Sequence, residues 1–219
     1  MRQRISFIGC IMLLFIISSA LAAEGPTDQV RTMLNEVMAI QNDPALQGPE
    51  RREDRRTGIK KIIANNFDFN IMARNALGDY WAKLNDSGKK EFVGIFQDLF
   101  QDSYTKLVLD FLKREQILFN QESIEKNTAE VGTAIVRKNE KIPVDYYLTQ
   151  ENERWLVHDV AIDSVSIAKN YQRSFSRIIQ RESFQSLLSK MRLQQKAIEH
   201  TGRDQSVPSG RPSPDLGGQ

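Results

Sequence analysis

The spacing of apolar residues divides the chain into a helical part, a sheet and a second helical part. From residue 26 to about 113, apolar side chains recur every three or four positions, which is the period of an amphipathic helix. This pattern predicts helices over residues 26–41, 50–65 and 86–113. The last helix carries a wide apolar stripe with four phenylalanines, and Asn85 or Asp86 can cap its start.

Beyond Gln116 the apolar period falls from about 3.6 residues to 2, which is typical of strands with one buried face. The links between the alternating runs are short enough for hairpins. We therefore predict an antiparallel meander of four strands, which lie around residues 117–119, 131–135, 142–148 and 154–162.

Two further helices are predicted after the strands, over 167–180 with Ser166 as its cap and over about 183–198. Helices, a meander and helices again define an α+β fold. We expect helices packed on one face of a curved four-stranded antiparallel sheet, with an apolar cavity between the layers.

Residues 1–22 have the pattern of a cleavable signal peptide. A basic start is followed by an apolar run and then by small residues, with cleavage expected after Ala22. The apolar run, 5–17, is shorter than the roughly 20 residues of a spanning helix, which argues against a membrane anchor. Cys10 lies in this segment, so the mature protein is expected to have no disulfide and no cysteine metal site.

Charge and composition argue against a nucleic-acid-binding function and indicate a single domain followed by a tail. The chain has 30 Lys and Arg and 28 Asp and Glu, but Arg2 and Arg4 belong to the signal segment, which has no acid. The mature chain is therefore neutral and offers no electrostatic basis for binding nucleic acid. Residues 23–198 suffice for a single domain, and residues 199–219, rich in Gly, Pro and Ser, are predicted to be a disordered tail.

The segment 67–81, FDFNIMARNALGDYW, concentrates large apolar side chains and contains no histidine, cysteine or other nucleophile. A segment of this composition builds or lines an apolar compartment. It indicates a protein that holds an apolar ligand rather than one that breaks bonds.

No constellation of catalytic residues is evident in the sequence. It lacks G-x-S-x-G, a glycine-rich phosphate loop and H-E-x-x-H. Of the two histidines, only His158 precedes the predicted tail, so a histidine-based mechanism would depend on it. The adjacent Asp159 is expected on the opposite face of the same strand and so does not pair with it. Without a cysteine or a second ordered histidine, no zinc site is expected. Asp68 and the other aspartates near strand ends are interpreted as caps and turn residues.

Three groups of residues, in this order behind a signal peptide, resemble the MlaC or toluene-tolerance family over about residues 26–193. The first group is Arg56, Ile62-Ile63, Phe67-Asp68-Phe69 and Met72-Ala73. The second is Ala76-Leu77-Gly78-x-x-Trp81 with the helix that carries Phe92, Phe96, Leu99 and Tyr104. The third is Trp155-x-Val157-x-Asp159-Val160, Val165-Ser166-Ile167 and Asn170-Tyr171-x-x-x-Phe175.

The resemblance implies a soluble periplasmic phospholipid carrier of Gram-negative bacteria. Its partners would be an outer-membrane lipoprotein–porin complex and an inner-membrane ABC transporter with an MCE-domain subunit, in a pathway that maintains outer-membrane lipid asymmetry. The acyl chains would lie between sheet and helices with the headgroup near solvent, and neither catalysis nor a cofactor is implied. In the family, an acidic residue and a glycine commonly precede a Val-Ser pair. In this chain Asp163-Ser164 precedes Val165-Ser166, so a serine replaces the glycine.

We expect acyl chains to contact apolar residues of the segment 67–81, of the helix 86–113 and of the sheet. The candidate lipid-binding residues are Phe67, Phe69, Met72, Leu77, Trp81, Phe96, Leu99, Phe100, Tyr104, Val108, Val144, Tyr146, Leu148, Trp155 and Val157.

Two other functions remain compatible with the same sequence. A cavity enzyme, such as a hydrolase or isomerase, would use His158 or a buried aspartate. A secreted adaptor without a ligand would use the apolar residues only as a closed core.

Overall fold

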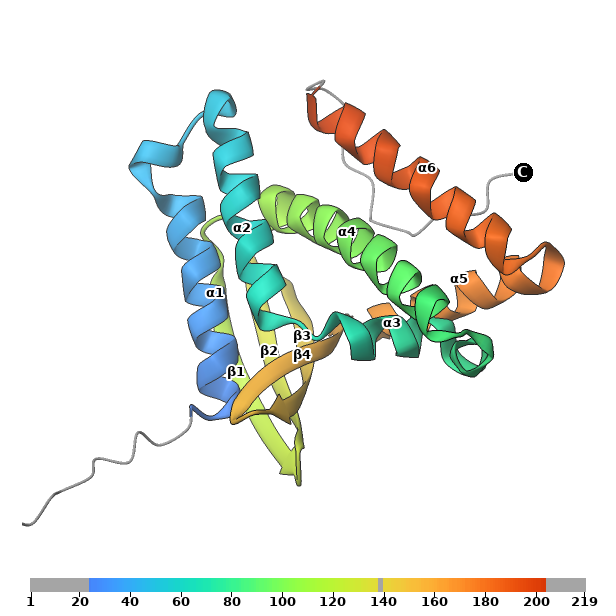
Figure 1. The fold of residues 1–219 in the computed structure, drawn as a ribbon. Coiled ribbons are helices and arrows are strands. Elements are labelled where there is room, and N and C mark those ends of the chain that lie inside the picture. Colours follow the sequence, from blue (N-terminus) through green and yellow to red (C-terminus); the bar gives the residue numbers. More distant parts are fainter. Residues whose placement is uncertain (1–23, 138–139, 204–219) are drawn as a thin grey trace, which may run out of the picture.

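The computed structural model describes residues 24–137 and 140–203 (Figure 1). The α-helices of this part are α1 (Pro26–Asn42), α2 (Arg52–Asn66), α3 (Phe69–Leu77), α4 (Asp86–Phe111), α5 (Ile167–Arg181) and α6 (Phe184–Arg203). Short 3₁₀ helices are η1 (Pro44–Leu46), η2 (Pro49–Arg51) and η3 (Gly78–Lys83). The strands are β1 (Gln116–Glu125), β2 (Thr128–Arg137), β3 (Glu140–Glu151), β4 (Arg154–Ile162) and β5 (Val165–Ser166).

The helix starts follow from local capping. The Asn85 side chain accepts a hydrogen bond from the backbone N–H of Gly88 at 2.8 Å, which makes it the cap of α4. The Ser166 hydroxyl accepts from the N–H of Lys169 at 3.1 Å and caps α5 as predicted. Each bond satisfies a backbone donor that the first helical turn leaves without an internal acceptor.

The segment 67–81 folds as α3 followed by η3. The Asp68 carboxylate accepts from the N–H of Ile71 at 2.9 Å and caps α3, which confirms its interpretation as a cap. Gly78 ends α3 with a φ of 55°. A Cβ at this position would lie 2.3 Å from Nε2 of Gln172, so glycine satisfies both the backbone angle and the close approach to α5.

The strands form one antiparallel sheet in the order β1-β2-β3-β4-β5. The four predicted strands are confirmed, and β5 is an addition of two residues that the alternation did not reveal. Between β3 and β4 the pairing shifts after Tyr147, which pairs with Asp159, to Leu148, which pairs with Val157. This bulge leaves His158 without a residue opposite it.

The β4–β5 turn departs from the glycine that such turns favour. Asp163 and Ser164 both have positive φ, at 51° and 64°, as a two-residue type I′ hairpin requires. Asp159 supports this turn from β4, because its carboxylate accepts hydrogen bonds from the Ser166 hydroxyl and from the N–H of Ala168 at 2.9 Å. The side chain thereby joins the sheet to the start of α5.

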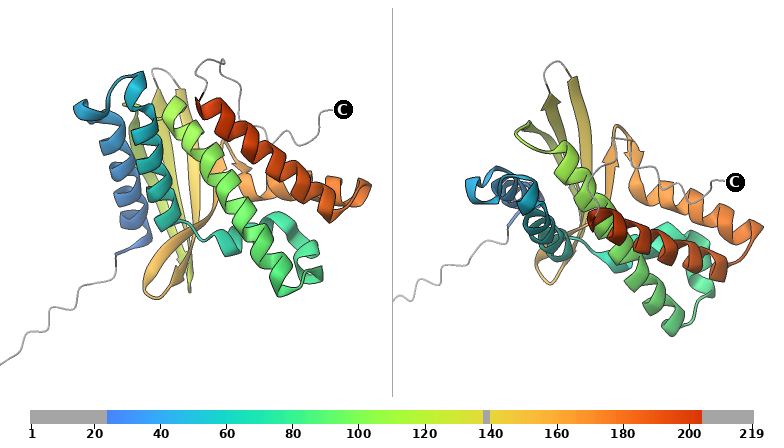
Figure 2. Two further views of the ribbon diagram at one scale, coloured as in Figure 1. Left: turned by 45° about the horizontal axis from the view of Figure 1, so that its top comes forward. Right: turned by 90° about the horizontal axis from the view of Figure 1, so that it is seen from above.

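The helices cover one face of the sheet, as predicted. Helices α1 and α2 lie side by side across the strands, and α4 crosses next to α2 (Figures 1 and 2). Helices α3, α5 and α6 extend beyond the sheet, where α3 packs on α5 and α6 packs on α4. The two ends of α4 therefore have different neighbours, a difference that determines where the molecule is hollow.

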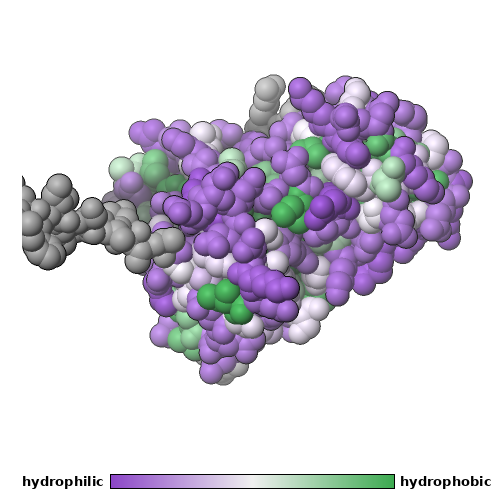
Figure 3. Space-filling view, turned by 60° about the horizontal axis from the view of Figure 1, so that its bottom comes forward, coloured by the Kyte–Doolittle hydropathy of each residue, from purple (hydrophilic) through white to green (hydrophobic). Residues whose placement is uncertain are grey.

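The predicted signal peptide, 1–22, lies outside the described residues. Of the predicted tail, 199–203 belong to α6, and 204–219 also lie outside the described part. Among the helices of residues 24–137 and 140–203, none is both long enough and apolar enough to cross a bilayer. The face in Figure 3 is mostly hydrophilic, with small and separate hydrophobic patches.

Candidate functional site: an apolar cavity with a charged end

A cavity of about 570 Å³ lies between the helical layer and one end of the sheet. Its volume is within the range of small-ligand sites. Its lining is predominantly apolar and comes from α1, α2, α4, α5 and the strands. The apolar lining residues are Met33, Leu34, Val37, Ile62, Ile63, Phe67, Phe100, Leu107, Val108, Phe111, Leu112, Ile117, Ile135, Ile142, Val144, Ile162, Val165 and Ile167.

The C-terminal half of α4 is the long wall of this cavity. Phe100, Tyr104, Val108 and Phe111 recur at helical spacing and line it. The N-terminal half of the same stripe instead fills a packed aromatic core. There the Phe92 ring lies 5.9 Å from that of Phe175 on α5 and 6.1 Å from that of Phe184 on α6, and Phe96 lies 5.3 Å from Tyr171.

The opposite wall is the end of the sheet where β1 and β3 begin and β2 and β4 end. Strand pairing places Ile117, Ile135 and Ile142 in one cross-strand row. Thr133, Val144 and Ile162 form the next row. Because side chains alternate along each strand, these rows present one continuous face to the cavity.

The polar groups inside the cavity are neutral hydroxyls and amides. Burial raises the pKa of Tyr104 and of Tyr146, whose hydroxyls are hydrogen bonded to each other. Burial also raises the pKa of Tyr171 to about 12, although a hydrogen bond from the Ser103 hydroxyl acts in the opposite direction. All four residues line the cavity, so its interior carries no phenolate charge near neutral pH.

Charged residues gather at the end of the cavity. Arg137, Glu140, Lys141 and Asp163 contribute to the lining there, and all but Arg137 are exposed. The guanidinium of Arg137 forms an ion pair with Glu115 at 2.9 Å and donates to the backbone carbonyl of Phe111. Apolar walls with a charged, exposed end suit an amphipathic ligand.

Glu115 is held as a carboxylate beside the cavity. Burial favours its neutral form, but hydrogen bonds from backbone N–H groups, including that of Lys113, and the charge of Arg137 outweigh it and lower the Glu115 pKa. The N–H of Lys113 donates to Glu115 at 2.5 Å. The carboxylate thus links the end of α4 to β2.

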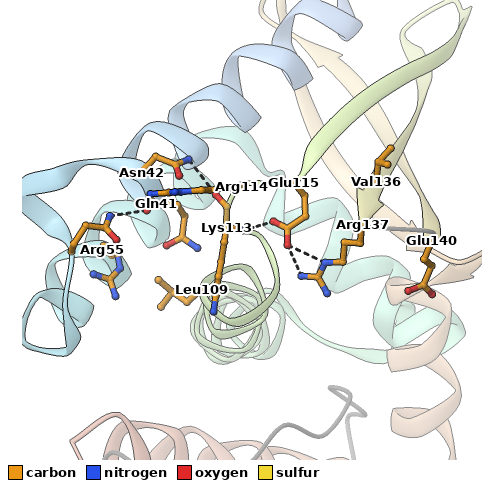
Figure 4. A pocket seen from close by; sticks show the side chains of 11 residues that line it. Gln41, Asn42, Arg55, Leu109, Lys113, Arg114, Glu115, Val136, Arg137 and Glu140 are labelled. Carbon is orange, nitrogen blue, oxygen red and sulfur yellow. Dashed lines mark hydrogen bonds and ion pairs between the residues drawn. The ribbon is translucent and has the colours of Figure 1, made fainter.

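A second, polar pocket of about 1010 Å³ adjoins the first and shares Arg137 and Glu140 with it. Figure 4 shows Gln41, Asn42 and Arg55 on one side of this pocket and Arg137 on the other, with the segment 113–115 between them.

Comparison with known proteins identifies the family. The model of the MlaC protein family matches residues 31–193, which is most of the chain. The chain belongs to the MlaC family. Members of this family are non-catalytic lipid carriers, in agreement with the expectation that the protein is not an enzyme.

A solved structure with the same fold is the phospholipid-binding protein from Ralstonia solanacearum, which was determined in complex with a phospholipid. The two chains are 18% identical and superpose with a TM-score of 0.68, over 78% of this chain and 97% of the other. No significant match to this MlaC family chain was found among curated proteins.

The structure brings six of the predicted lipid-binding residues to the cavity. These are Phe67, Phe100, Tyr104, Val108, Val144 and Tyr146. Their contact with lipid stays a prediction.

The other nine predicted residues lie outside the cavity lining. Eight of them are buried in the packed core, and Trp81 in η3 is half-buried. They lie in α3, in η3, in α4 up to its middle and in the far half of β3 and β4, where helices close on one another or on the sheet. These residues are Phe69, Met72, Leu77, Trp81, Phe96, Leu99, Leu148, Trp155 and Val157.

Helices α1 and α2 also contribute to the lining, which was not predicted from the sequence. Met33, Leu34 and Val37 of α1, with Ile62 and Ile63 of α2, line the cavity. Their helical periodicity was apparent, but it indicated only a buried face. That this face lies against the cavity depends on how α1 and α2 pack on the sheet, and the sequence does not show this packing.

Among the residues that the structure describes, His158 has no catalytic partner. Its Nδ1 atom is buried and has no hydrogen-bond partner among the described residues, and burial lowers its pKa despite the nearby Asp159 carboxylate. A histidine base needs a group that orients its ring, but Asp159 already accepts hydrogen bonds from the α5 start.

A buried aspartate of this MlaC family chain also has a structural role. Asp102 accepts from Arg56 at 2.7 Å and from Lys60 at 2.6 Å, which ties α4 to α2. Within residues 24–137 and 140–203, no three His, Cys, Asp or Glu side chains lie close enough to hold a metal ion.

Proposed function

We propose that this protein is a periplasmic phospholipid carrier. It holds acyl chains in the apolar cavity and moves lipid between the outer and inner membranes. The observation that carries this proposal is the cavity itself, which is apolar within and charged at its exposed end. A relative with the same fold is a phospholipid-binding protein determined with a phospholipid, which supports the same ligand here.

The physical need for such a carrier is large. Exposing one methylene to water costs about 0.8 kcal/mol, so one sixteen-carbon chain costs on the order of 10 kcal/mol. Two chains cost roughly twice as much, and free diffusion of a phospholipid across an aqueous space is negligible. A carrier therefore needs apolar volume more than catalytic chemistry.

The N-terminal sequence and the family support a proposed location and proposed partners. A cleaved signal over 1–22 would deliver a domain of residues 23–198 to the periplasm. We infer that its protein partners are an inner-membrane ABC transporter with an MCE-domain subunit and an outer-membrane lipoprotein–porin complex. An adaptor without a ligand is disfavoured, because its core would have been closed.

The test uses protein exported to the periplasm and purified without detergent. Native mass spectrometry is expected to find phospholipid bound, and the delipidated protein should take up fluorescent phospholipid from liposomes. Val108→Trp places a bulky ring in the cavity and should weaken both signals. The matched control is Val93→Trp, on the same helix and also partly buried, but outside the lining.

Val93→Trp should retain bound lipid. Wild-type protein that carries no lipid and takes up none would refute the proposal, and so would equal loss of lipid in the two variants, because it would assign the effect to folding rather than to the cavity.

A further inference from the structure

The polar pocket beside the cavity is placed to meet the head of any lipid whose chains occupy the cavity. The two spaces share Arg137 and Glu140. If the chains of an amphipathic ligand lie among the apolar walls, its polar head must therefore emerge at this charged end. Its polar group would then lie at the polar pocket.

The frame of the polar pocket is fixed by hydrogen bonds to backbone carbonyls. The Gln41 amide donates to the carbonyl of Leu112 at 2.6 Å, and the Asn42 amide donates to that of Lys113 at 3.1 Å. Arg55 donates to the carbonyl of Gly48 at 3.1 Å and also to that of Leu46. These side chains hold the walls of the pocket in place, and their donors are already hydrogen bonded to backbone carbonyls.

Two cations of the pocket are not engaged in this way. The side chains of Lys113 and Arg114 are exposed and make no hydrogen bond or ion pair within the described part of the chain. Arg137 is neutralised by Glu115. With Arg55 also present, the lining has four cations against two carboxylates, Glu115 and Glu140. This local excess stands out in a mature chain that is neutral overall.

We propose that Lys113 and Arg114 bind the phosphate of the lipid headgroup in the polar pocket. This inference rests on the proposed carrier function and adds a contact that selects phospholipids over uncharged lipids with the same chains. Ammonium and guanidinium groups are the usual partners of phosphate, and their charge-assisted hydrogen bonds are stronger than neutral ones. The phosphate is that of the bound lipid, because the pocket continues into the acyl cavity.

The experiment measures lipid uptake by delipidated protein from phosphatidylcholine vesicles. Each vesicle carries a trace of a labelled lipid, either phosphatidylethanolamine or diacylglycerol with identical acyl chains. Since neither label changes the vesicle charge, the two probes differ only in the headgroup. The double variant Lys113→Gln with Arg114→Gln is compared with Lys90→Gln with Arg173→Gln, which removes two exposed cations that line neither pocket.

Wild-type protein is expected to take up phosphatidylethanolamine in preference to diacylglycerol. The pocket variant should lose roughly tenfold in phosphatidylethanolamine uptake, as expected for lost charge-assisted bonds, and nothing in diacylglycerol uptake. The control variant should match wild type. Equal effects of the pocket variant on both probes, or none on either, would overturn the inference and leave the carrier function standing.

Two further outcomes separate the remaining possibilities. A titration with inorganic phosphate, followed by phosphorus NMR, distinguishes a free anion from a headgroup. Phosphate binding that the pocket variant loses, together with unchanged phospholipid uptake, would assign the site to a free anion and overturn the headgroup. Wild-type protein that takes up neither lipid would overturn the carrier function itself, and this inference with it.

Discussion

Val144 and Val157 provide a direct test of where the interior is hollow. Both are buried β-branched residues of the central strands, 3% and 1% exposed, and the sequence predicts lipid contact for both. The structure separates them. Val144 lines the cavity, whereas Val157 pairs with Phe67, and its carbonyl accepts from the N–H of Asp68 at 2.9 Å. Substitution of each by phenylalanine should therefore have opposite effects.

Val157→Phe places four additional carbons where no space exists. Overpacking of a closed core costs about 1–3 kcal/mol, which for a domain of this size lowers the melting temperature by about 2–4 °C per kcal/mol. Val144→Phe places the same atoms in the cavity. At about 0.8 kcal/mol per buried carbon, less the entropy of the fixed ring, the empty protein should gain about 1–2 kcal/mol.

The assay is thermal unfolding of loaded and delipidated forms. A ligand at 100 times its dissociation constant stabilises the native state by about 2.7 kcal/mol, so loading should raise the melting temperature of wild type and of Val157→Phe. Loading should raise the melting temperature of Val144→Phe by less, because its larger side chain takes part of the cavity that lipid would fill. The reasoning is refuted if Val144→Phe destabilises the protein as much as Val157→Phe and still carries lipid.

Three other variants test separate features of the structure. Asp102→Ala should cost about 3 kcal/mol in urea unfolding, because it leaves Arg56 and Lys60 without the partner they share; a cost below about 1 kcal/mol would contradict this role. Ser164→Gly should gain about 0.5–1 kcal/mol by relieving a positive φ, with lipid uptake unchanged, and no gain would show that the turn is unstrained. His158 has a folded pKa below 6.5, so the unfolded state binds the proton first and stability should fall as pH drops through 6.5; His158→Gln should flatten this profile and retain lipid uptake, and an identical profile would refute the assignment.

Local patterns in the sequence predict most elements of this fold, although not helix α3. The change of period near Gln116 marks the start of the sheet, and Asp68 and Ser166 cap the helices they precede. These features depend on neighbours within a few residues. The bulge at His158 and the two-residue β5 were not predicted, since both depend on the pairing partner rather than on the strand's own alternation.

The cavity could be predicted only in part, because a cavity wall and a packed core require the same residues. Phe96 and Phe100 lie on one stripe of α4, one turn apart, and both are about 1% exposed. Phe100 lines the cavity, whereas Phe96 packs against Tyr171 and Phe175. The difference comes from α5 and α6, which close over one end of α4 and leave the other facing the sheet. The residue type, helix face and burial of the two phenylalanines are the same, so none of them distinguishes the cavity wall from the packed core.

The size of the cavity also constrains how a carrier can work. The cavity of 570 Å³ is open at its charged end. If it were closed and dry, a void of that volume would cost up to about 14 kcal/mol at roughly 24 cal/mol per Å³, while whole domains are stable by only about 5–15 kcal/mol. The walls are kept apart at the charged end by Gln41 and Arg137, which bind the last carbonyls of α4. A bound lipid removes the cost of the void by filling it. Because Gln41 and Arg137 hold the walls apart, the protein without lipid is expected to admit water at the exposed end. The loaded and empty forms would then differ in the hydration of the apolar walls, and expelling that water favours lipid binding.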